Sequence, residues 1–427
     1  MIDGSRGILR SMEVAEALAP LVNRLVGTDL PFRIRFWDGS AIGPTGAPAT
    51  IVVRTPRALR RVATAPGELG LGRAYVSGEI DLEGELQSVL AIGDRRPEFR
   101  LGPAGWARAA RTAIAAGALH PWFLPPPPEE ARLRGRRHTR ERDAAAISHH
   151  YDISNDFYRL VLGPTMTYSC AYFASPESSL EDAQTDKHGL ICRKLRLQDG
   201  ERMLDVGCGW GTLAIHAASR HGVSVVGVTL SQKQAELAAK RAAEAGVGDR
   251  VEIRVQDERD VDDGPFDAIA SVGMFEHVGA ERLAEYFGHL YSLLRPQGRL
   301  LNHGISRPPG KRTRFVRRGF IDRYVFPDGE LHEVGAVASV MQRAGFEVRD
   351  LESLREHYAL TLRRWVANLE ANQTEAVALV GEGRYRVWRL YMAAAARNFD
   401  RGRTQVHQIL AIRSDGGRSG LPLRRAV

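Results

Sequence analysis

The chain has 427 residues, with 59 Lys and Arg against 51 Asp and Glu, which gives a formal net charge of +8. At roughly 100–200 residues per domain, this length predicts two or three domains. Apolar residues make up 44% and charged residues 26%, which excludes a disordered chain. No uncharged apolar run approaches the about 20 residues of a transmembrane helix, and we expect no secretory signal because the N-terminus lacks an apolar stretch.

The three cysteines, Cys170, Cys192 and Cys208, cannot make a disulfide framework, so a reducing cytoplasm is expected. The basic excess indicates an anionic partner, either nucleic acid or a membrane surface. A GC-rich genome that uses Arg freely would explain the same excess. No nucleic-acid-binding motif accompanies the basic residues, so a nucleic-acid partner is not expected.

Residues 1–120 predict a small α+β module for lipid binding or oligomerisation. Apolar residues recur with helical spacing over residues 11–26. Three β-like pieces follow at residues 32–37, 50–54 and 73–82, with turn signals between them. No catalytic cluster occurs in this region.

Residues 121–143 predict a linker. Four prolines at 125–128 are typical of a stiff, extended spacer. Six arginines follow between residues 132 and 142. They form either a solvated linker or a segment attracted to anionic lipid, where each basic residue contributes roughly 1 kcal/mol.

The pattern of residues 144–427 predicts one large α/β domain. Strand-like apolar stretches lie at residues 202–206, 223–228, 251–255, 267–272, 299–303, 346–351 and 406–412. Helical stretches between the early ones predict a mostly parallel, doubly wound, seven-stranded sheet. Residues 306–334 and 359–400 interrupt the alternation, and we expect helical insertions there that cap a site.

A glycine-rich loop directly follows the first strand of this domain. Its residues Asp205, Gly207, Cys208, Gly209 and Gly211 are the expected cofactor contacts, because glycine lets the backbone approach a ligand where a Cβ would clash. A dinucleotide fingerprint needs G-x-G-x-x-G, which the loop does not match. The Asp-x-Gly-x-Gly-x-Gly spacing resembles motif I of class I S-adenosylmethionine (SAM) methyltransferases, which have a Rossmann-like sheet.

Further cofactor contacts are expected after the next two strands. The second strand ends in Thr229 and Leu230, without the acid that often binds ribose there, so Gln234 is the candidate for that polar contact. After the third strand come Asp257 and Glu258. Asp257 is our choice as the acceptor for the adenine amino group, with a plain helix N-cap as its alternative.

Five separated segments together resemble one family. They are HHYDISNDFY at 149–158, TYSCAYF at 167–173, LDVGCGWG at 204–211, TLSQKQ at 229–234 and GMFEHVG at 273–279. They resemble the cyclopropane-fatty-acyl-phospholipid synthases, including the mycolic acid cyclopropane synthases. The catalytic resemblance spans about residues 144–413. The N-terminal region resembles the extra domain of full-length, phospholipid-acting members.

The resemblance implies methyl transfer from SAM to a cis double bond of an acyl chain, with a bound bicarbonate ion as general base. By this resemblance, the bicarbonate ligands are Cys170, Glu276, His303, Tyr358 and the backbone of Ile305; Tyr151 sits in the same pocket; and Tyr168 and Ser169 lie near the methionine end of the cofactor. Methylation leaves a carbocation, which negative charge and aromatic faces stabilise until a base removes a proton.

Each of these side chains also has a structural interpretation. Cys170 is a candidate small core residue, His303 a hydrogen-bonded strand residue, Glu276 a helix cap and Tyr358 a core residue. No metal site is expected, because the His and Cys residues lack zinc-ligand spacing. Cys192 has no role that the sequence assigns.

The resemblance leaves the product open between a cyclopropane ring and an exocyclic methylene. Residues 302–306 read NHGIS where bacterial cyclopropane synthases usually read H-T-I-G. This departure favours the branch that forms a 10-methylene acyl chain, the precursor of tuberculostearate, which a separate reductase completes. The alternatives are a cyclopropane synthase, a methyltransferase for another unsaturated metabolite, and a non-catalytic lipid-binding protein.

The substrate implies contact with a membrane surface. Residues 311–318, KRTRFVRR, mix basic and apolar side chains, which suits peripheral binding to anionic lipid. An exposed charged loop is the alternative. We therefore expect a cytoplasmic protein at the inner face of the membrane, and full-length relatives imply a homodimer.

Overall fold

The computed structural model describes residues 13–65, 67–91, 124–131, 135, 139–143, 154–310 and 319–424. Its internal contacts divide the chain into two units. Unit 1 comprises Met1–Ala131, Arg314–Val325 and Gly381–Arg397, and unit 2 comprises Arg132–Thr313, Phe326–Val380 and Asn398–Val427. Two segments of unit 1 therefore come from the stretch that the sequence analysis assigns wholly to the catalytic domain.

Unit 1 contains the predicted α+β module. Its elements in the N-terminal region are α1 (Val14–Val26), β1 (Arg33–Arg35), β2 (Ala41–Ile42), β3 (Ala49–Val53), α2 (Arg57–Thr64), α3 (Glu68–Val76), β4 (Ile80–Gly84) and α4 (Leu86–Leu90). The strand order is β2-β1-β3-β4, with β1 and β3 parallel. The core gathers apolar side chains from α1 and the strands, including Leu18, Phe32 and Ile34.

The prediction of a β-like piece at residues 73–82 is wrong for its first part. Residues 73–76 complete helix α3, and the strand begins only at Ile80. Gly78 adopts a positive φ of 70°, and the N–H of Glu79 donates to the carbonyl of Ala74 at 2.9 Å. Glycine tolerates this left-handed turn, which ends the helix and redirects the chain into the strand.

The proline run packs as part of unit 1. The carbonyl of Pro125 accepts a hydrogen bond from Arg61 at 2.9 Å. Glu130, just after the prolines, is buried and binds Arg73 through two hydrogen bonds of 2.7 Å. Bidentate pairs of this kind fix geometry well. The segment is therefore held in place and is not a free spacer.

Unit 2 contains the predicted seven-stranded sheet. Its strands are β5 (Arg202–Val206), β6 (Ser224–Thr229), β7 (Val251–Val255), β8 (Phe266–Val272), β9 (Leu294–Ser306), β10 (Glu347–Ser353) and β11 (Gln405–Ile412). The order is β10-β11-β9-β8-β5-β6-β7, and β11 runs antiparallel to both of its neighbours. All seven predicted strands are confirmed, and β9 begins five residues earlier, at Leu294 instead of residue 299.

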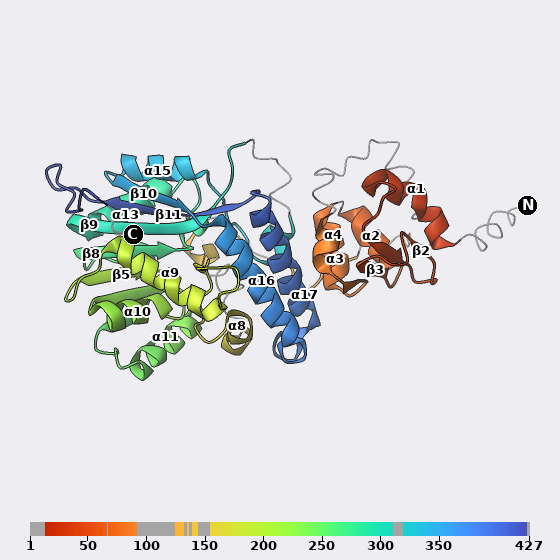
Figure 1. Cartoon of the computed structure of the whole chain (residues 1–427), viewed down its shortest axis with the longest axis horizontal. Coiled ribbons are helices and arrows are strands. Elements are labelled where there is room, and N and C mark those ends of the chain that lie inside the picture. The colour runs from red at the N-terminus through yellow and green to blue at the C-terminus, as the bar shows by residue number, and fades with distance from the viewer. Residues whose placement is uncertain are drawn as a thin grey trace, which may run out of the picture. The chain divides into compact units, whose positions relative to one another are not determined.

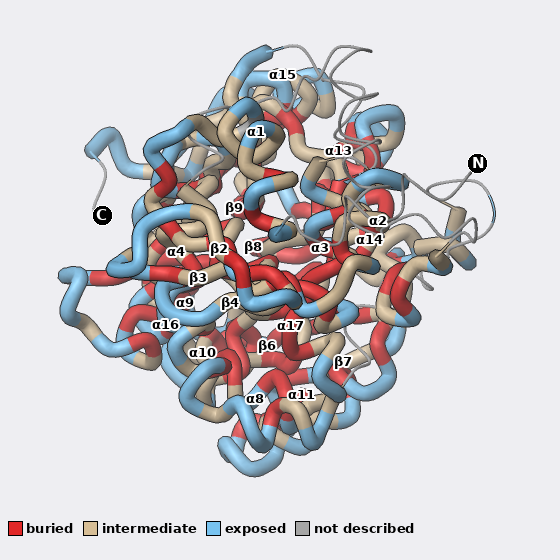
Figure 2. The backbone as a smooth tube through the Cα atoms, turned by 90° about the vertical axis from the view of Figure 1, so that its right-hand side faces the viewer, coloured by how far each residue is buried: buried red, intermediate tan, exposed pale blue. Residues whose placement is uncertain are grey.

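Helices cover both faces of this sheet (Figure 1). Helices α9 (Leu180–Leu195), α10 (Thr212–His221) and α11 (Gln232–Glu244) share one apolar core with the sheet. On the other face, α13 (Leu283–Leu293) and α15 (Val334–Arg343) share a second. Figure 2 shows buried backbone along the central strands, where both faces of the sheet are covered.

Unit 2 also contains several helices outside these two layers. They are α8 (Asn155–Leu162), the short helices η2 (Glu258–Asp260) and α12 (Phe275–Val278), and α16 (Arg355–Ala371). Of the predicted insertions, the first contains α14 (Phe320–Tyr324). The second contains most of α16 and α17 (Gln373–Asp400), which is kinked at Gly381. No described helix has the length and apolar character needed to cross a membrane.

Strand order reverses between β5 and β8. The chain moves outward from β5 to β6 and β7, then returns to β8 on the other side of β5. Loops that leave two neighbouring strands in opposite directions open a crevice at the carboxyl ends of the strands, where open α/β sheets bind ligands. The glycine-rich loop follows β5 and therefore lies at this point.

Candidate active site

The glycine-rich loop after β5 turns sharply. The N–H groups of Gly207 and Cys208 both donate to the carbonyl of Val228 at 3.0 Å. Gly207 has a φ of 73°, and a Cβ there would lie 2.5 Å from the side chain of Met274. Gly209 also has positive φ but faces open space. The loop thus needs glycine for its conformation and leaves one side free for a ligand.

A cavity opens beside this loop, at the carboxyl ends of β5, β6 and β8. The predicted cofactor residues that line it are Tyr168, Ser169, Asp205, Gly207, Cys208, Gly209, Thr229, Leu230, Gln234 and Glu258. Gly211 and Asp257 are not in its lining. A Cβ at Gly211 would lie 3.0 Å from the Cβ of Ala238, so this glycine allows α10 and α11 to pack closely.

Gln234 takes a fixed orientation at the end of β6. The hydroxyl of Thr229 donates to its side-chain oxygen at 2.8 Å, and Ser231 caps α11 by accepting from the backbone N–H of Gln234 at 3.2 Å. Both Thr229 and Gln234 are buried and line the cavity. Because the oxygen is occupied, the amide is oriented with its NH₂ group as the part available to a ligand.

Asp257, the predicted adenine acceptor, faces Arg259 and does not line the cavity. Asp257 caps η2, and its carboxylate forms a two-pronged ion pair with Arg259 at 2.7 and 2.6 Å. The neighbouring Glu258 lines the cavity instead. Burial, with the nearby Asp257 charge, raises the pKa of Glu258 to about 7. Glu258 is therefore the carboxylate available to an adenine amino group.

Sequence reasoning missed a buried lysine in the cavity wall. Lys187 is almost completely buried on α9 and lines the cavity together with His188 and Asp205. Burial lowers the pKa of Lys187 to about 8 and raises that of Asp205 to about 7. Within the described ranges, one oxygen of Asp205 has no hydrogen-bond partner. The available signal was a lysine on the apolar stripe of a helix, between Ala183 and Ile191.

Cys170 is held against α16. Its thiol donates to the carbonyls of Ala171 at 3.2 Å and Leu354 at 3.6 Å. The N–H of Ala171 donates to the hydroxyl of Thr361 at 3.1 Å. Burial raises the pKa of the Cys170 thiol far above its ordinary value. A neutral thiol is a poor nucleophile, so covalent catalysis by Cys170 is disfavoured.

Glu276 lies on α12, the short helix that follows β8, and contacts the end of β9. It is buried, and one carboxylate oxygen accepts from the backbone N–H of Ile305 at 2.7 Å, while the other has no hydrogen-bond partner among the residues that the structure describes. Burial raises the pKa of Glu276 to about 7. A Cβ at Gly304 would lie 1.9 Å from the Phe275 ring and 3.1 Å from Glu276, so glycine is what admits this arrangement.

His303 and Tyr358 complete the described part of the predicted set. Burial, together with Lys187 and Lys194, lowers the pKa of His303 to about 3, and its Nδ1 lies 3.3 Å from the side-chain nitrogen of Gln408. The buried Tyr358 ring lies 6.1 Å from Trp365. Tyr151 falls outside the described residues.

A model of the mycolic acid cyclopropane synthetase family matches residues 138–409. The chain belongs to this family. A domain family of unknown function also matches, over residues 22–98. The predicted family and the prediction of a SAM-dependent enzyme are thereby confirmed.

Two full-length relatives come from Mycobacterium tuberculosis. A probable fatty acid methyltransferase is 46% identical over 410 residues, which is 92% of this chain and 94% of that protein. The tuberculostearic acid methyltransferase UfaA1 is 36% identical over 417 residues, covering 94% of this chain and 92% of that protein. Family membership therefore extends through the N-terminal region as well as the sheet.

A solved family member matches unit 2 in structure. The mycolic acid cyclopropane synthase CmaA1, complexed with SAH and CTAB, has a TM-score of 0.60 and 37% identity over 63% of this chain and 98% of that one. The predicted class I methyltransferase fold is confirmed. SAM, with its product S-adenosylhomocysteine (SAH), is the cofactor of this fold, and the cavity beside Gly207 is the site that fits it.

Proposed function

We propose that this enzyme transfers the SAM methyl group to the cis double bond of an oleoyl-type phospholipid acyl chain and forms a 10-methylene product. The observation that carries the proposal is the buried Glu276 side chain, one of whose carboxylate oxygens has no hydrogen-bond partner among the described residues. A buried negative charge stabilises a nearby carbocation and can hold a base in position. The full-length relatives named as fatty acid methyltransferases support the substrate class.

Aromatic rings around Tyr168 suit the cationic intermediate. Tyr168 lines the cofactor cavity, and its ring lies 5.2 Å from Trp365 and 5.8 Å from Tyr158. Tyr358 lies 4.7 Å from Phe399. Aromatic faces attract cations, so such rings would stabilise a carbocation that is shielded from water. An alkene attacks the methyl sulfonium, and the positive charge then rests on the acyl carbon near these rings.

Glu276 and His303 offer groups suited to a bicarbonate ion, which would supply the base when present. The unpartnered oxygen of Glu276 accepts a hydrogen bond from its O–H. His303 stays neutral; with Nδ1 facing the Gln408 amide as an acceptor, its Nε2–H is the donor toward an anion. Ile305 differs from the expectation, because its N–H binds Glu276 directly. In this arrangement Ile305 positions Glu276.

Two observations favour a methylene product: a departure from the usual family sequence at Gly304, and the name of one full-length relative. Gly304 stands where cyclopropane synthases usually carry threonine, and it admits the close approach of Phe275 and Glu276. A relative over the full length is named as a tuberculostearic acid methyltransferase. Loss of the proton after a hydride shift gives the methylene, whereas direct loss from the added methyl group gives a cyclopropane, the alternative product.

Expression in a host with oleoyl phospholipids tests the proposal. Fatty acids are analysed by mass spectrometry and NMR. We expect a one-carbon gain with a vinylidene signal. Ring-proton signals would establish the cyclopropane alternative, and no mass gain from a protein that binds SAH would overturn lipid methylation and favour a lipid-binding role.

Peripheral membrane binding and homodimerisation are part of the same proposal. Of the linker arginines, Arg140 and Arg142 are paired with Asp260 and Asp328, so they are not available to lipid. The basic segment 311–318 lies outside the described residues. Flotation with anionic and neutral vesicles, before and after replacing the basic residues of 311–318 by Ser, tests the membrane contact. Salt-insensitive or equal binding would contradict it.

A further inference from the structure

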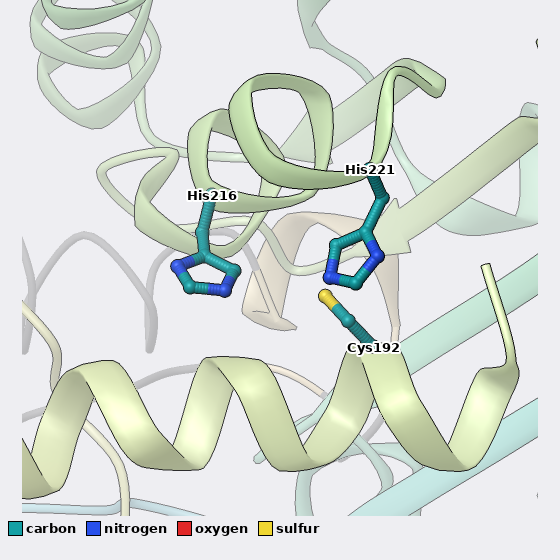
Figure 3. A group of neighbouring side chains, drawn as sticks. All are labelled: Cys192, His216 and His221. Atoms are coloured by element: carbon teal, nitrogen blue, oxygen red, sulfur yellow. The ribbon is translucent and has the colours of Figure 1, made fainter. Parts of the chain in front are cut away.

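Three side chains outside the proposed chemistry point toward one another between helices α9 and α10. They are Cys192 from α9 and His216 and His221 from α10 (Figure 3). One potential ligand atom from each residue lies within 4.8 Å of the others. The sequence predicts no metal site, because no short spacing motif joins these residues. Strand β5 separates the two helices in the chain.

Close packing of the two helices produces this arrangement. Cys192 is fully buried in an apolar core that contains Ala214, Ala217 and Ala218 of α10. On α9, a Cβ built at Gly189 would lie 4.0 Å from Nε2 of His216. Small residues on both helices thus let the thiol and the two rings meet. His216 and His221 are only partly buried, so an ion can reach them from solvent.

We propose that Cys192, His216 and His221 form a Zn²⁺ site with a water molecule as the fourth ligand. One thiolate and two imidazoles belong to the ligand set that zinc prefers. Zn–S and Zn–N bonds of about 2.3 and 2.0–2.1 Å place neighbouring ligand atoms of a tetrahedral site about 3.3–3.6 Å apart. The observed spread needs only side-chain rotations to reach this geometry.

The surrounding charges make Cys192 the decisive ligand. Arg193, Arg220 and Lys187 act electrostatically on His216, and Arg193 acts on His221. These positive charges oppose a bare divalent cation. A thiolate bonded directly to zinc offsets part of that repulsion, whereas two neutral imidazoles do not. Removing the thiol should therefore weaken binding more than removing either ring.

The site would connect the two helices that wall the cofactor cavity. Helix α9 contributes Lys187 and His188 to that cavity, and α10 contributes Thr212 and Leu213. The rings of His188 and His216 lie 5.8 Å apart. An ion held between α9 and α10 fixes their spacing, and it therefore stabilises the folded form by mass action.

Cobalt substitution tests the ligand set without using activity. The full-length protein is stripped with a chelator and titrated with Co²⁺. We expect thiolate-to-cobalt charge-transfer absorption and tetrahedral d–d bands, which Zn²⁺ abolishes by displacement. The charge-transfer absorption should vanish in Cys192→Ala and persist in Cys208→Ala, which removes another buried thiol of the same unit. An unchanged spectrum in Cys192→Ala would overturn the proposal.

Zinc affinity, measured by competition with a chromophoric chelator, gives a second readout. The double variant His216→Ala/His221→Ala should lose its one equivalent of Zn²⁺, and His289→Ala should keep it. Zn²⁺ should raise the Tm of the wild type and leave that of the double variant unchanged, with folding verified by circular dichroism. Equal zinc affinity in the wild type and the double variant would overturn the site.

Discussion

The Glu276 carboxylate accepts a 2.7 Å hydrogen bond from the backbone N–H of Ile305, joining the loop after β8 to the end of β9. This bond holds one oxygen of the carboxylate, and the other is buried with no hydrogen-bond partner in the described part of the chain. The orientation depends on two strands that are adjacent in the sheet and parallel. Glu276 is thereby fixed before any ligand arrives, as an electrostatic contribution to catalysis requires.

Replacing Glu276 by Gln should separate chemistry from binding. The amide oxygen can still accept from Ile305, but the negative charge and the acceptor that would hold the bicarbonate base in position are lost. We expect methylated product to fall by about 10²–10⁴-fold, the usual contribution of a positioned base. SAH affinity, measured by calorimetry, should stay nearly unchanged. Glu281→Gln, at an exposed position, is the control. Equal losses of rate and affinity would refute the role.

Gly304→Ala should disturb the same site by steric overlap. The new Cβ would lie 1.9 Å from the Phe275 ring. Overpacking of this kind costs about 1–3 kcal/mol. We expect lower stability in urea denaturation and lower activity. Gly335→Ala is the matched control, since it is exposed on α15 with nothing within 4 Å, and helix propensity favours Ala there by up to about 1 kcal/mol. Identical effects of both substitutions would contradict the placement of Phe275.

Asp205→Asn should change how stability depends on pH. Burial raises the pKa of Asp205 from 3.8 to about 7. Between these values the folded state binds more protons than the unfolded state, so wild-type stability falls as pH rises. The Asn variant loses this contribution. The Tm of the variant minus that of the wild type should therefore increase as the pH is raised from about 4 to 7. Parallel Tm profiles over this range would show that Asp205 is not perturbed in this way.

Glu258 and Asp257 should affect SAM binding differently. Glu258 lines the cavity, so Glu258→Gln should weaken SAH binding by about tenfold, the loss expected for one charge-assisted hydrogen bond. Because the pKa of Glu258 is raised to about 7, wild-type SAH affinity should increase as pH rises through that value. Asp257→Asn should act mainly on stability, through the η2 cap and Arg259. A larger loss of SAH affinity in Asp257→Asn would restore the original assignment.

The sequence by itself determined the sheet and the cofactor loop. All seven strands of unit 2 follow from local apolar runs. The glycines at 207, 209 and 211 can be read from the sequence, and all three adopt positive φ in the loop. These features are local, so periodicity and residue type are sufficient to predict them. The helix over residues 73–76 was missed, because short apolar stretches fit helix and strand equally well.

Tertiary structure decided which side chains meet. Lys187 reaches the cavity because α9 packs on the sheet. Glu258 lines the cavity and Asp257 does not, because the Asp257 carboxylate is paired with Arg259. Cys192 meets His216 and His221 only because alanines let α9 and α10 approach. Such contacts join segments that are distant in the chain, and their partners are chosen by packing and burial. The order of residues along the chain does not by itself show how the segments pack or which side chains become buried.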